Sequence, residues 1–254
     1  MFIESFEDAL KWRRHQRKKL KRGNKRQRSV ARKLSKCRRG HRCGTEACRV
    51  CMRDFRIWWS GEAIKIIAQR PHWTRCSVIT KGLLLPYGRL QKFDLNAEVK
   101  RIRKRLERSE IRGRIVLGAL DVSLNIENNV IAGWQFHGYL IVEGQNDDAL
   151  QRAIKHAFPP EPSALAPYDF VEVNNPLDAV TYAYKALFER RSGYRDSQGN
   201  HQTKNQPLKR GDLRELLPSL AKYKVGARLI LSGVRRNGQQ LVFTSTKRSP
   251  VPQT

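Results

Sequence analysis

The chain is poor in acidic residues. Its 254 residues include 23 Asp and Glu against 51 Lys and Arg, which gives a formal net charge of +28. It also lacks an uncharged apolar run of the roughly 18 to 20 residues that a membrane-spanning helix needs, and its first residues lack a signal-peptide stretch. These absences argue against secretion and membrane spanning, and predict a cytoplasmic protein without a membrane partner. The excess of positive charge predicts a polyanionic partner, of which nucleic acid is the commonest.

The basic residues are concentrated near the N-terminus. Residues 11–42 hold 17 Lys or Arg and no Asp or Glu. Such a run can be a solvated helix face, but without acidic neighbours its self-repulsion disfavours compact structure, so we expect a basic N-terminal arm over residues 1–36 that contacts nucleic acid. The predicted contacts are Arg13, Arg14, Lys18, Lys19, Lys21, Arg22, Lys25, Arg26, Arg38 and Arg39.

Four of the five cysteines lie within 15 residues, and they are Cys37, Cys43, Cys48 and Cys51. Clustered cysteines in a reducing compartment bind metal more often than they form disulfides. Four thiolates suit Zn²⁺, and the Cys-x-x-Cys spacing of the last two lets both sulfurs reach one ion. His41 is an alternative ligand in place of Cys37 or Cys43. Four protein ligands leave no open coordination position, so we predict a structural zinc module over residues 37–60.

The remaining pattern predicts an α+β fold. Helices are expected over 95–109, 147–157 and 175–188, and strands over 75–81, 115–125 and 130–142. The Gly, Ser, Asn and Gln content of residues 191–212 predicts a flexible loop. Residues 213–254 are expected to add C-terminal strands, with a hairpin at Asn237-Gly238. Because the strands come in hairpins, the sheet is expected to be antiparallel. Cys76 lies in a predicted strand and is assigned to the core.

The two long central strands have chemically distinctive residues on one face. Side chains alternate along a strand, so burying both apolar faces together requires a register that places Asp121 on the same side as Gln135 and His137. A carboxylate, an amide oxygen and an imidazole on one face can hold a divalent cation. On periodicity alone, a strand histidine is more often a hydrogen-bonded, partly exposed residue.

The predicted helix over 175–188 contains a second set of candidates. Tyr182 and Lys185 are three residues apart, and would share a helix face. A tyrosine hydroxyl can attack phosphorus if a cation stabilises the phenolate. In isolation, the pattern favours Tyr182 and Tyr184 as packing residues and Lys185 as a solvated charge.

In order and spacing, these segments resemble rolling-circle replication initiators of plasmids and phages, within the HUH endonuclease superfamily. The cysteine segment precedes a strand motif at Arg75–Thr80, which is similar to the Thr-ending first motif of that family. The Leu120–Asn125 and Trp134–Val142 strands are similar to the pair that carries the His-hydrophobic-His metal motif, with Gln135 in place of the first histidine. Tyr182-Ala-Tyr-Lys185 is similar to the family's Tyr-x-x-Lys motif. The resemblance covers about residues 35–190.

The resemblance implies an HUH-like core over residues 70–190: an antiparallel sheet of about five strands with helices packed on it. It implies that His137, Gln135 and Asp121 bind Mg²⁺ or Mn²⁺. Tyr182 would nick single-stranded origin DNA in a bacterial cytoplasm, leaving a 5′-phosphotyrosine and a 3′-hydroxyl primer, with Lys185 assisting. Since no GxxxxGK[ST] phosphate loop is present, a host helicase and polymerase would be partners.

Two other functions remain open from the sequence. A non-catalytic, zinc-stabilised nucleic-acid-binding protein on the same scaffold would explain Gln135 at the metal motif. A basic scaffold protein of a ribonucleoprotein particle would explain the charge but not the ordered motifs. Tyr184 also remains an alternative nucleophile.

Overall fold

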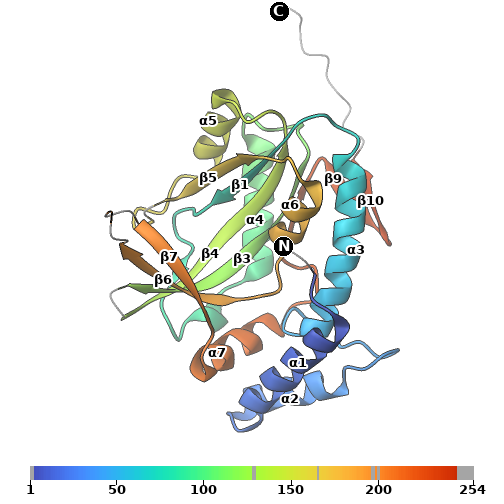
Figure 1. Cartoon of the computed structure of the whole chain (residues 1–254), viewed down its shortest axis with the longest axis vertical. Helices are drawn as coiled ribbons and strands as arrows, with labels where there is room; N and C mark the ends of the chain where they lie inside the picture. The colour runs from blue at the N-terminus through green and yellow to red at the C-terminus, as the bar shows by residue number, and fades with distance from the viewer. Residues whose placement is uncertain (1–2, 128–129, 165, 196–197, 199–200, 245–254) are drawn as a thin grey trace, which may run out of the picture.

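The structure, a computed structural model, describes residues 3–127, 130–164, 166–195, 198 and 201–244. They form an α+β fold around a mixed sheet of eight strands in the order β5-β1-β4-β3-β6-β7, with β2 paired to β4 and β8 to β3 (Figure 1). The strands are β1 Trp73–Val78, β2 Leu84–Leu85, β3 Val116–Glu127, β4 Val130–Glu143, β5 Tyr168–Glu172, β6 Glu189–Arg195, β7 His201–Pro207 and β8 Leu229–Ser232.

The prediction of an antiparallel sheet of about five strands is wrong in size and in type. Five strands do pair antiparallel in the order β5-β1-β4-β3-β8. However, β6 pairs parallel to β3, opposite residues 124–126, and β7 pairs antiparallel to β6. The predicted flexible loop over 191–212 is therefore also wrong, since most of it belongs to this hairpin and to the start of a helix. Sheet pairing satisfied the backbone there in spite of poor strand propensity, which tertiary context commonly overrides.

The central strands β3 and β4 pair in the predicted register. Asp121 lies opposite His137, and Ser123 lies opposite Gln135. The alternate residues Leu120 and Val122 turn to the other face and are buried in the core. The hydrophobic pattern favoured this register because a slip of one residue would have turned the apolar set of one strand away from that of the other.

Helices cover both faces of the sheet. The helices are α1 Phe6–Lys21, α2 Lys25–Lys36, α3 Arg49–Ile67, α4 Leu95–Arg108, α5 Asp148–Ala157, α6 Pro176–Ala183 and α7 Arg210–Leu220, with a 3₁₀ turn η1 at Leu90–Lys92, and α1 and α2 pack on α3 and α7 rather than on the sheet. Helix α4 buries Val99, Ile102 and Leu106 in the same core as Leu120 and Val122, whereas α3 and α6 pack over the opposite face (Figure 1). The predicted helices over 95–109 and 147–157 are confirmed as α4 and α5.

The basic N-terminal segment, predicted as an arm, forms a helical hairpin of α1 and α2. Asn24 and Gln27 build a capping box that begins α2. Leu20 and Leu34 are buried, so the apolar stripe of each helix turns inward while the cations turn to solvent. Arg214 of α7 donates hydrogen bonds to the carbonyls of Lys19 and Arg22 at 3.2 and 2.9 Å, which attaches the hairpin to the body of the protein.

The predicted hairpin at Asn237-Gly238 is confirmed. Strands β9 Val234–Asn237 and β10 Gln240–Phe243 form a separate two-stranded sheet. Gly238 has φ of +58°, the left-handed conformation that such a turn requires. Among the described residues, the helices are all too short or too polar to cross a bilayer.

Candidate functional site

The four clustered cysteines converge on one point between α2 and α3. Cys37 follows the last residue of α2, and Cys48 precedes the first residue of α3. All four Sγ atoms lie within 4.8 Å of one another, and three of the pairs are 3.6 Å apart. A zinc ion bound by four thiolates at about 2.3 Å separates its sulfurs by about 3.8 Å. Residues 37–51, called the cysteine module below, could therefore hold a structural metal ion.

The thiols influence one another strongly. The Cys48 thiol donates to the Cys37 sulfur, which lowers the pKa of Cys37 to about 6 and raises that of Cys48. Hydrogen bonds from Cys48 and Cys51 lower the pKa of Cys43 to about 2. The predicted alternative ligand His41 is exposed and pairs with Arg38 through its backbone, outside the sulfur group. Cys76 is fully buried in β1, as predicted.

Asp121, Gln135 and His137 lie together on the face of the sheet that α3 and α6 cover. Each is at most 3% exposed. His137 Nε2 is 3.2 Å from Asp121 Oδ2, and Gln135 lies two residues before His137 on β4. The Gln135 amide nitrogen donates to the Phe136 carbonyl at 2.9 Å. Both carboxylate oxygens of Asp121 and both ring nitrogens of His137 are buried without an aligned hydrogen bond.

The charges around Asp121 set its protonation state. Burial raises its pKa, but the Lys185 ammonium at 2.9 Å, with His137 and Arg228, lowers the pKa well below its usual range. Burial would lower the pKa of Lys185, yet Asp121 raises it above its usual value. Burial lowers the pKa of His137 despite the neighbouring carboxylate. At neutral pH, the site therefore holds a carboxylate, an ammonium and a neutral imidazole.

Tyr182 and Lys185 reach this face in a different way from the one predicted. Helix α6 ends at Ala183, not at Phe188, and Tyr184 has non-helical dihedral angles of −119° and 61°. The chain then runs extended into β6, because that strand must pair beside β3. Lys185 lies beyond the helix, and its contact with Asp121 comes from this change of direction rather than from helical spacing.

The Tyr182 hydroxyl meets a second phenol that the sequence did not single out. Its oxygen lies 3.1 Å from the hydroxyl oxygen of Tyr139 on β4. Arg191 of β6 donates to the Tyr139 oxygen at 3.0 Å. Burial, together with Tyr139, raises the pKa of Tyr182 to about 12. The residues Asp121, Gln135, His137, Tyr139, Tyr182, Lys185 and Arg191 are called the tyrosine face below.

A buried ion pair connects the cysteine module to the tyrosine face. Glu46, between Cys43 and Cys48, is fully buried, and accepts hydrogen bonds from Arg228 Nε at 3.0 Å and the Gly226 backbone at 2.9 Å. The Tyr184 hydroxyl also donates to Glu46. Gly226 has φ of +93°, and a Cβ there would lie 2.8 Å from the Phe55 ring, so only glycine fits.

Arg228 connects Glu46 to the residues of the tyrosine face. It is 1% exposed and donates to the backbone carbonyls of Leu120 and Lys185 at 3.2 and 3.1 Å. Its Nη1 lies 3.7 Å from Asp121 Oδ1. Burial would lower the pKa of Arg228, but Glu46 raises it, so the guanidinium stays charged.

Four residues of this arrangement were missed from the sequence: Glu46, Tyr139, Arg191 and Arg228. Tyr139 had a usable signal, because its odd position on β4 places it on the same face as His137. Arg191 lay in a segment predicted to be a loop. Glu46 and Arg228 are 182 residues apart in the chain, and no local pattern predicts their pairing.

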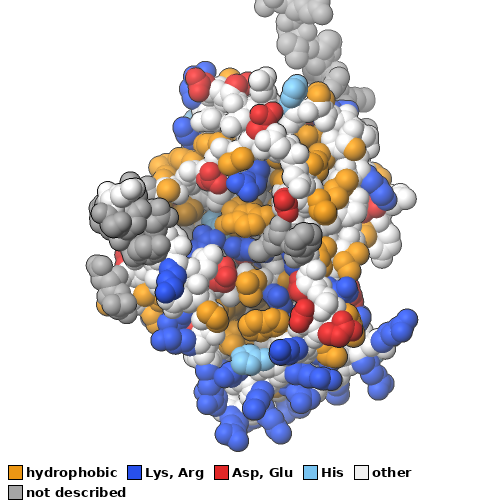
Figure 2. Space-filling model, in the orientation of Figure 1, with side chains coloured by type: hydrophobic (Ala, Val, Ile, Leu, Met, Phe, Trp, Pro, Cys, Tyr) orange, Lys and Arg blue, Asp and Glu red, His pale blue; other side chains and the backbone are white. Residues whose placement is uncertain are grey.

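The predicted nucleic-acid contacts lie on the helical hairpin of α1 and α2 and the turn that follows. Eight of the ten are exposed, and Arg13 and Lys19 are half-buried. Arg13 donates to the Cys37 carbonyl, and Arg26 to the Gln91 side chain, so these two also attach the hairpin to its neighbours. Lys and Arg side chains dominate the lower edge of the molecule, over α1 and α2 (Figure 2).

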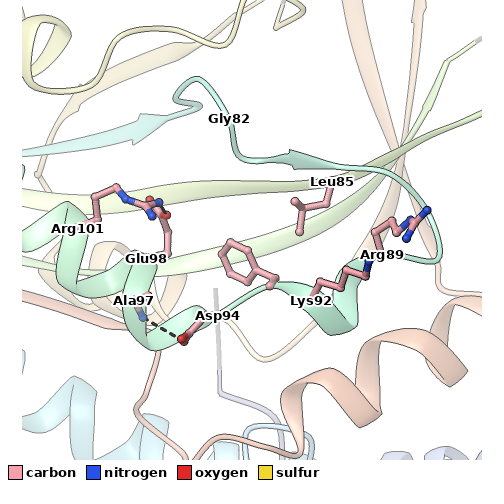
Figure 3. Close-up of a pocket in the computed structure, with 9 residues that line it drawn as sticks. Gly82, Leu85, Arg89, Lys92, Asp94, Ala97, Glu98 and Arg101 are labelled. Carbon is pink, nitrogen blue, oxygen red and sulfur yellow. Dashed lines mark hydrogen bonds and ion pairs between the residues drawn. The ribbon is translucent and has the colours of Figure 1, made fainter.

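A surface groove of about 480 Å³ lies elsewhere, between β2, η1 and α4 (Figure 3). Arg89, Lys92 and Arg101 line it. The buried Glu98 carboxylate there pairs with Arg101. Phe93 stacks on Phe136, whose side chain faces away from Tyr139, so the groove is on the opposite side of the sheet from the tyrosine face.

Comparisons with models of protein families, with curated proteins and with solved structures give no match to the chain.

Proposed function

We propose that this protein nicks single-stranded DNA at a replication origin, with Tyr182 as the nucleophile. The observation that carries the proposal is the position of the Tyr182 hydroxyl. It is half-buried at the end of α6, 3.1 Å from the Tyr139 hydroxyl, and on the sheet face that holds Asp121 and His137. Lys185, at 5.4 Å from the Tyr182 ring, adds positive charge beside the phenol.

The proposed reaction is a transesterification. The Tyr182 oxygen forms a bond to phosphorus as the bond from phosphorus to the 3′ oxygen breaks. The proton that the phenol loses is balanced by the proton that the departing 3′ oxygen gains. The products are a 5′-phosphotyrosine and a 3′-hydroxyl, which a host polymerase would extend after a host helicase separates the strands. Positive charge near the phosphate stabilises the negative charge that develops on its oxygens in the transition state.

The residues of the tyrosine face fit a divalent cation in their chemistry. Buried ring nitrogens and carboxylate oxygens without aligned hydrogen bonds are uncommon, and a ligand would satisfy them. The neutral imidazole of His137 is the form that binds metal. His137, Asp121 and Gln135 would hold Mg²⁺ or Mn²⁺, and the bound ion would supply positive charge to the scissile phosphate. The Lys185 ammonium already occupies one side of Asp121, which leaves His137 and Gln135 a larger share of the coordination.

The surroundings of the two tyrosines favour Tyr182 over Tyr184. Tyr184 is completely buried and its hydroxyl donates to Glu46. Burial and the Glu46 carboxylate raise the pKa of Tyr184 well above its usual value. A phosphate would have to displace this buried network to reach it, whereas the Tyr182 ring is partly exposed.

The charged hairpin and the cysteine module have supporting roles in this proposal. The exposed cations of α1 and α2 would contact DNA phosphates, which position the DNA without specifying its sequence. Their contribution should decrease steeply as salt rises from about 50 to 200 mM, because binding releases condensed counterions. A zinc ion on the four cysteines would stabilise the adjoining ends of α2 and α3.

The test is covalent capture. Purified protein is mixed with Mn²⁺ and a labelled pool of single-stranded DNA that includes the native origin, and the label that stays on the protein in SDS is measured. We expect an adduct with the wild type and with Tyr184→Phe, and none with Tyr182→Phe. Circular dichroism of each variant checks that it is folded.

The second candidate is a non-catalytic nucleic-acid-binding protein, which the replacement of a metal-binding histidine by Gln135 favours. Absence of any adduct, with DNA binding retained by the same samples, would support that function and reject the nickase.

A further inference from the structure

The half-buried Arg191 has a buried donor atom that is not used. On β6, it lies opposite Asn125 of β3, which places its side chain on the tyrosine face. One terminal nitrogen donates to the Tyr139 hydroxyl, while Nε is buried without a partner. Within the described residues, no carboxylate lies at ion-pair distance from this guanidinium. Buried donors are nearly always hydrogen-bonded, so the unpaired Nε–H of Arg191 calls for a partner.

Two other cations near the phenols, Lys185 of the tyrosine face and Arg75 of β1, are already paired. Lys185 contacts Asp121 at 2.9 Å, and Arg75 contacts Asp169 at 3.5 Å. Both still lie near the phenols: the Arg75 guanidinium is 5.6 Å from the Tyr182 ring centre, and the Lys185 ammonium is 5.3 Å from that of Tyr139. The two phenols are thus bordered by three cations, of which Arg191 is the one with an unmatched charge.

We propose that Arg191 is a catalytic residue that binds the scissile phosphate, through its free Nε–H and a terminal N–H, while Tyr139 orients the Tyr182 hydroxyl. This inference rests on the proposed function, and it adds a phosphate-binding residue outside the motifs of the sequence. The planar guanidinium can give two parallel hydrogen bonds to one phosphate, which an ammonium cannot. Because Arg191 and Tyr182 both contact Tyr139, one phosphate can lie within reach of the arginine and the nucleophile.

The first experiment does not depend on cleavage. Binding of a labelled 30-nucleotide oligothymidine is measured by fluorescence anisotropy at several salt concentrations, with Tyr182→Phe as the common background. For a single strand, each phosphate contact adds about 0.7 to the slope of log affinity against log salt. We expect Arg191→Ala to reduce the slope by about that amount. The matched control Arg152→Ala, on the exposed surface of α5, should leave the slope unchanged.

The second experiment uses the cleaved sequence recovered from the covalent adducts. An oligonucleotide of this sequence is made with an ordinary phosphate or an uncharged methylphosphonate at the scissile position. On the ordinary substrate, Arg191→Ala should lower the rate of adduct formation at least about 100-fold, as loss of one transition-state donor commonly does. On the methylphosphonate the same substitution should cost less than tenfold. Arg191→Lys should recover only part of the rate.

The outcomes separate this inference from the proposed function. A reduced salt slope without any wild-type adduct would keep Arg191 as a phosphate-binding residue and reject the nickase. An adduct with wild type, an unchanged slope and equal rate losses on both substrates would keep the nickase and overturn the role of Arg191. Arg191→Ala would then act by loosening Tyr139, a structural effect that does not depend on phosphate charge.

Discussion

Tyr182 and Tyr184 are two residues apart at the end of α6, yet they belong to different regions. Tyr184 turns to the cysteine module, where its hydroxyl donates to Glu46. Tyr182 turns to the tyrosine face, where its hydroxyl meets Tyr139. In the first region, the buried charges of Glu46 and Arg228 are fully paired. In the second region, His137, Asp121 and Arg191 keep buried polar atoms without hydrogen bonds.

This difference suggests a structural role for the cysteine module and a ligand-binding role for the tyrosine face. Leaving a buried polar group unsatisfied costs about 1–3 kcal/mol, so a ligand that pairs the open atoms of the tyrosine face would be bound with that advantage. In the cysteine module a bound metal ion would pair the four thiolates, and the atoms left buried without a partner are Thr45 Oγ1 and Arg49 Nε. On the tyrosine face, a cation beside Asp121 and His137 and an anion beside Arg191 would pair the atoms that are buried without a partner. Changes in the two regions should therefore affect different properties, which the following predictions test.

Removal of metal from the cysteine module should have the largest effect. Structural zinc contributes on the order of 10 kcal/mol of apparent folding free energy in small zinc domains. We expect one zinc per chain by elemental analysis, and unfolding of the module in the presence of a strong chelator. Cys48→Ala should lose the metal. Cys76→Ala, which changes a buried cysteine outside the cluster, should keep it. Full zinc content in Cys48→Ala would contradict the proposed ligand set.

Breaking the ion pair that connects the two regions should have the next largest effect on stability. Removing one partner of a buried pair costs about 3–5 kcal/mol, because the other charge stays buried alone. Glu46→Gln and Arg228→Met should each show a loss of this size in urea denaturation. The double variant should be more stable than the sum of the single losses implies. Additive losses would show that the two side chains do not act together.

The sequence predicted the parts of each region that are local. The cysteines are close in the chain, and the alternation on β3 and β4 predicted the pairing of Asp121 with the His137 side of the sheet. Both patterns act within one element or between adjacent ones. The α4 and α5 helices were predictable for the same reason, since their apolar stripes are continuous.

The parts that were not predicted depend on contacts between distant segments. Arg191 reaches Tyr139 because β6 joins the sheet in parallel beside β3, although its residues are typical of a loop. The end of α6 at Ala183 follows from the same pairing. The motifs that resemble a replication initiator predicted neither the parallel strand nor the Glu46–Arg228 pair, because they specify none of these residues.

Replacing each of the two tyrosines by phenylalanine should lower the unfolding free energy by different amounts in the two regions, and both losses should be smaller than those from breaking the ion pair. Tyr184→Phe leaves the buried Glu46 carboxylate with one donor fewer, and should cost about 1.5–3 kcal/mol of unfolding free energy. Tyr182→Phe should cost less than about 1 kcal/mol, because its ring is partly exposed and its partner is an uncharged hydroxyl. The measurement is urea denaturation at pH 7. Equal losses would mean that Tyr182 is as much a part of the structural core as Tyr184.

The smallest expected effect is the pH dependence that Tyr182 adds. Its pKa is raised to about 12 in the folded protein, mainly by burial, whereas an unfolded tyrosine has a pKa of about 10. The unfolded chain therefore loses this proton first as pH rises, and stability that is fully present below pH 10 decreases above it. The difference in unfolding free energy between wild type and Tyr182→Phe should shift by less than about 1 kcal/mol against wild type between pH 8 and 10.5, because the partly exposed phenol is screened by solvent. A constant difference over this range would mean that the phenol has an ordinary pKa and is already solvated, which would weaken the contrast with Tyr184.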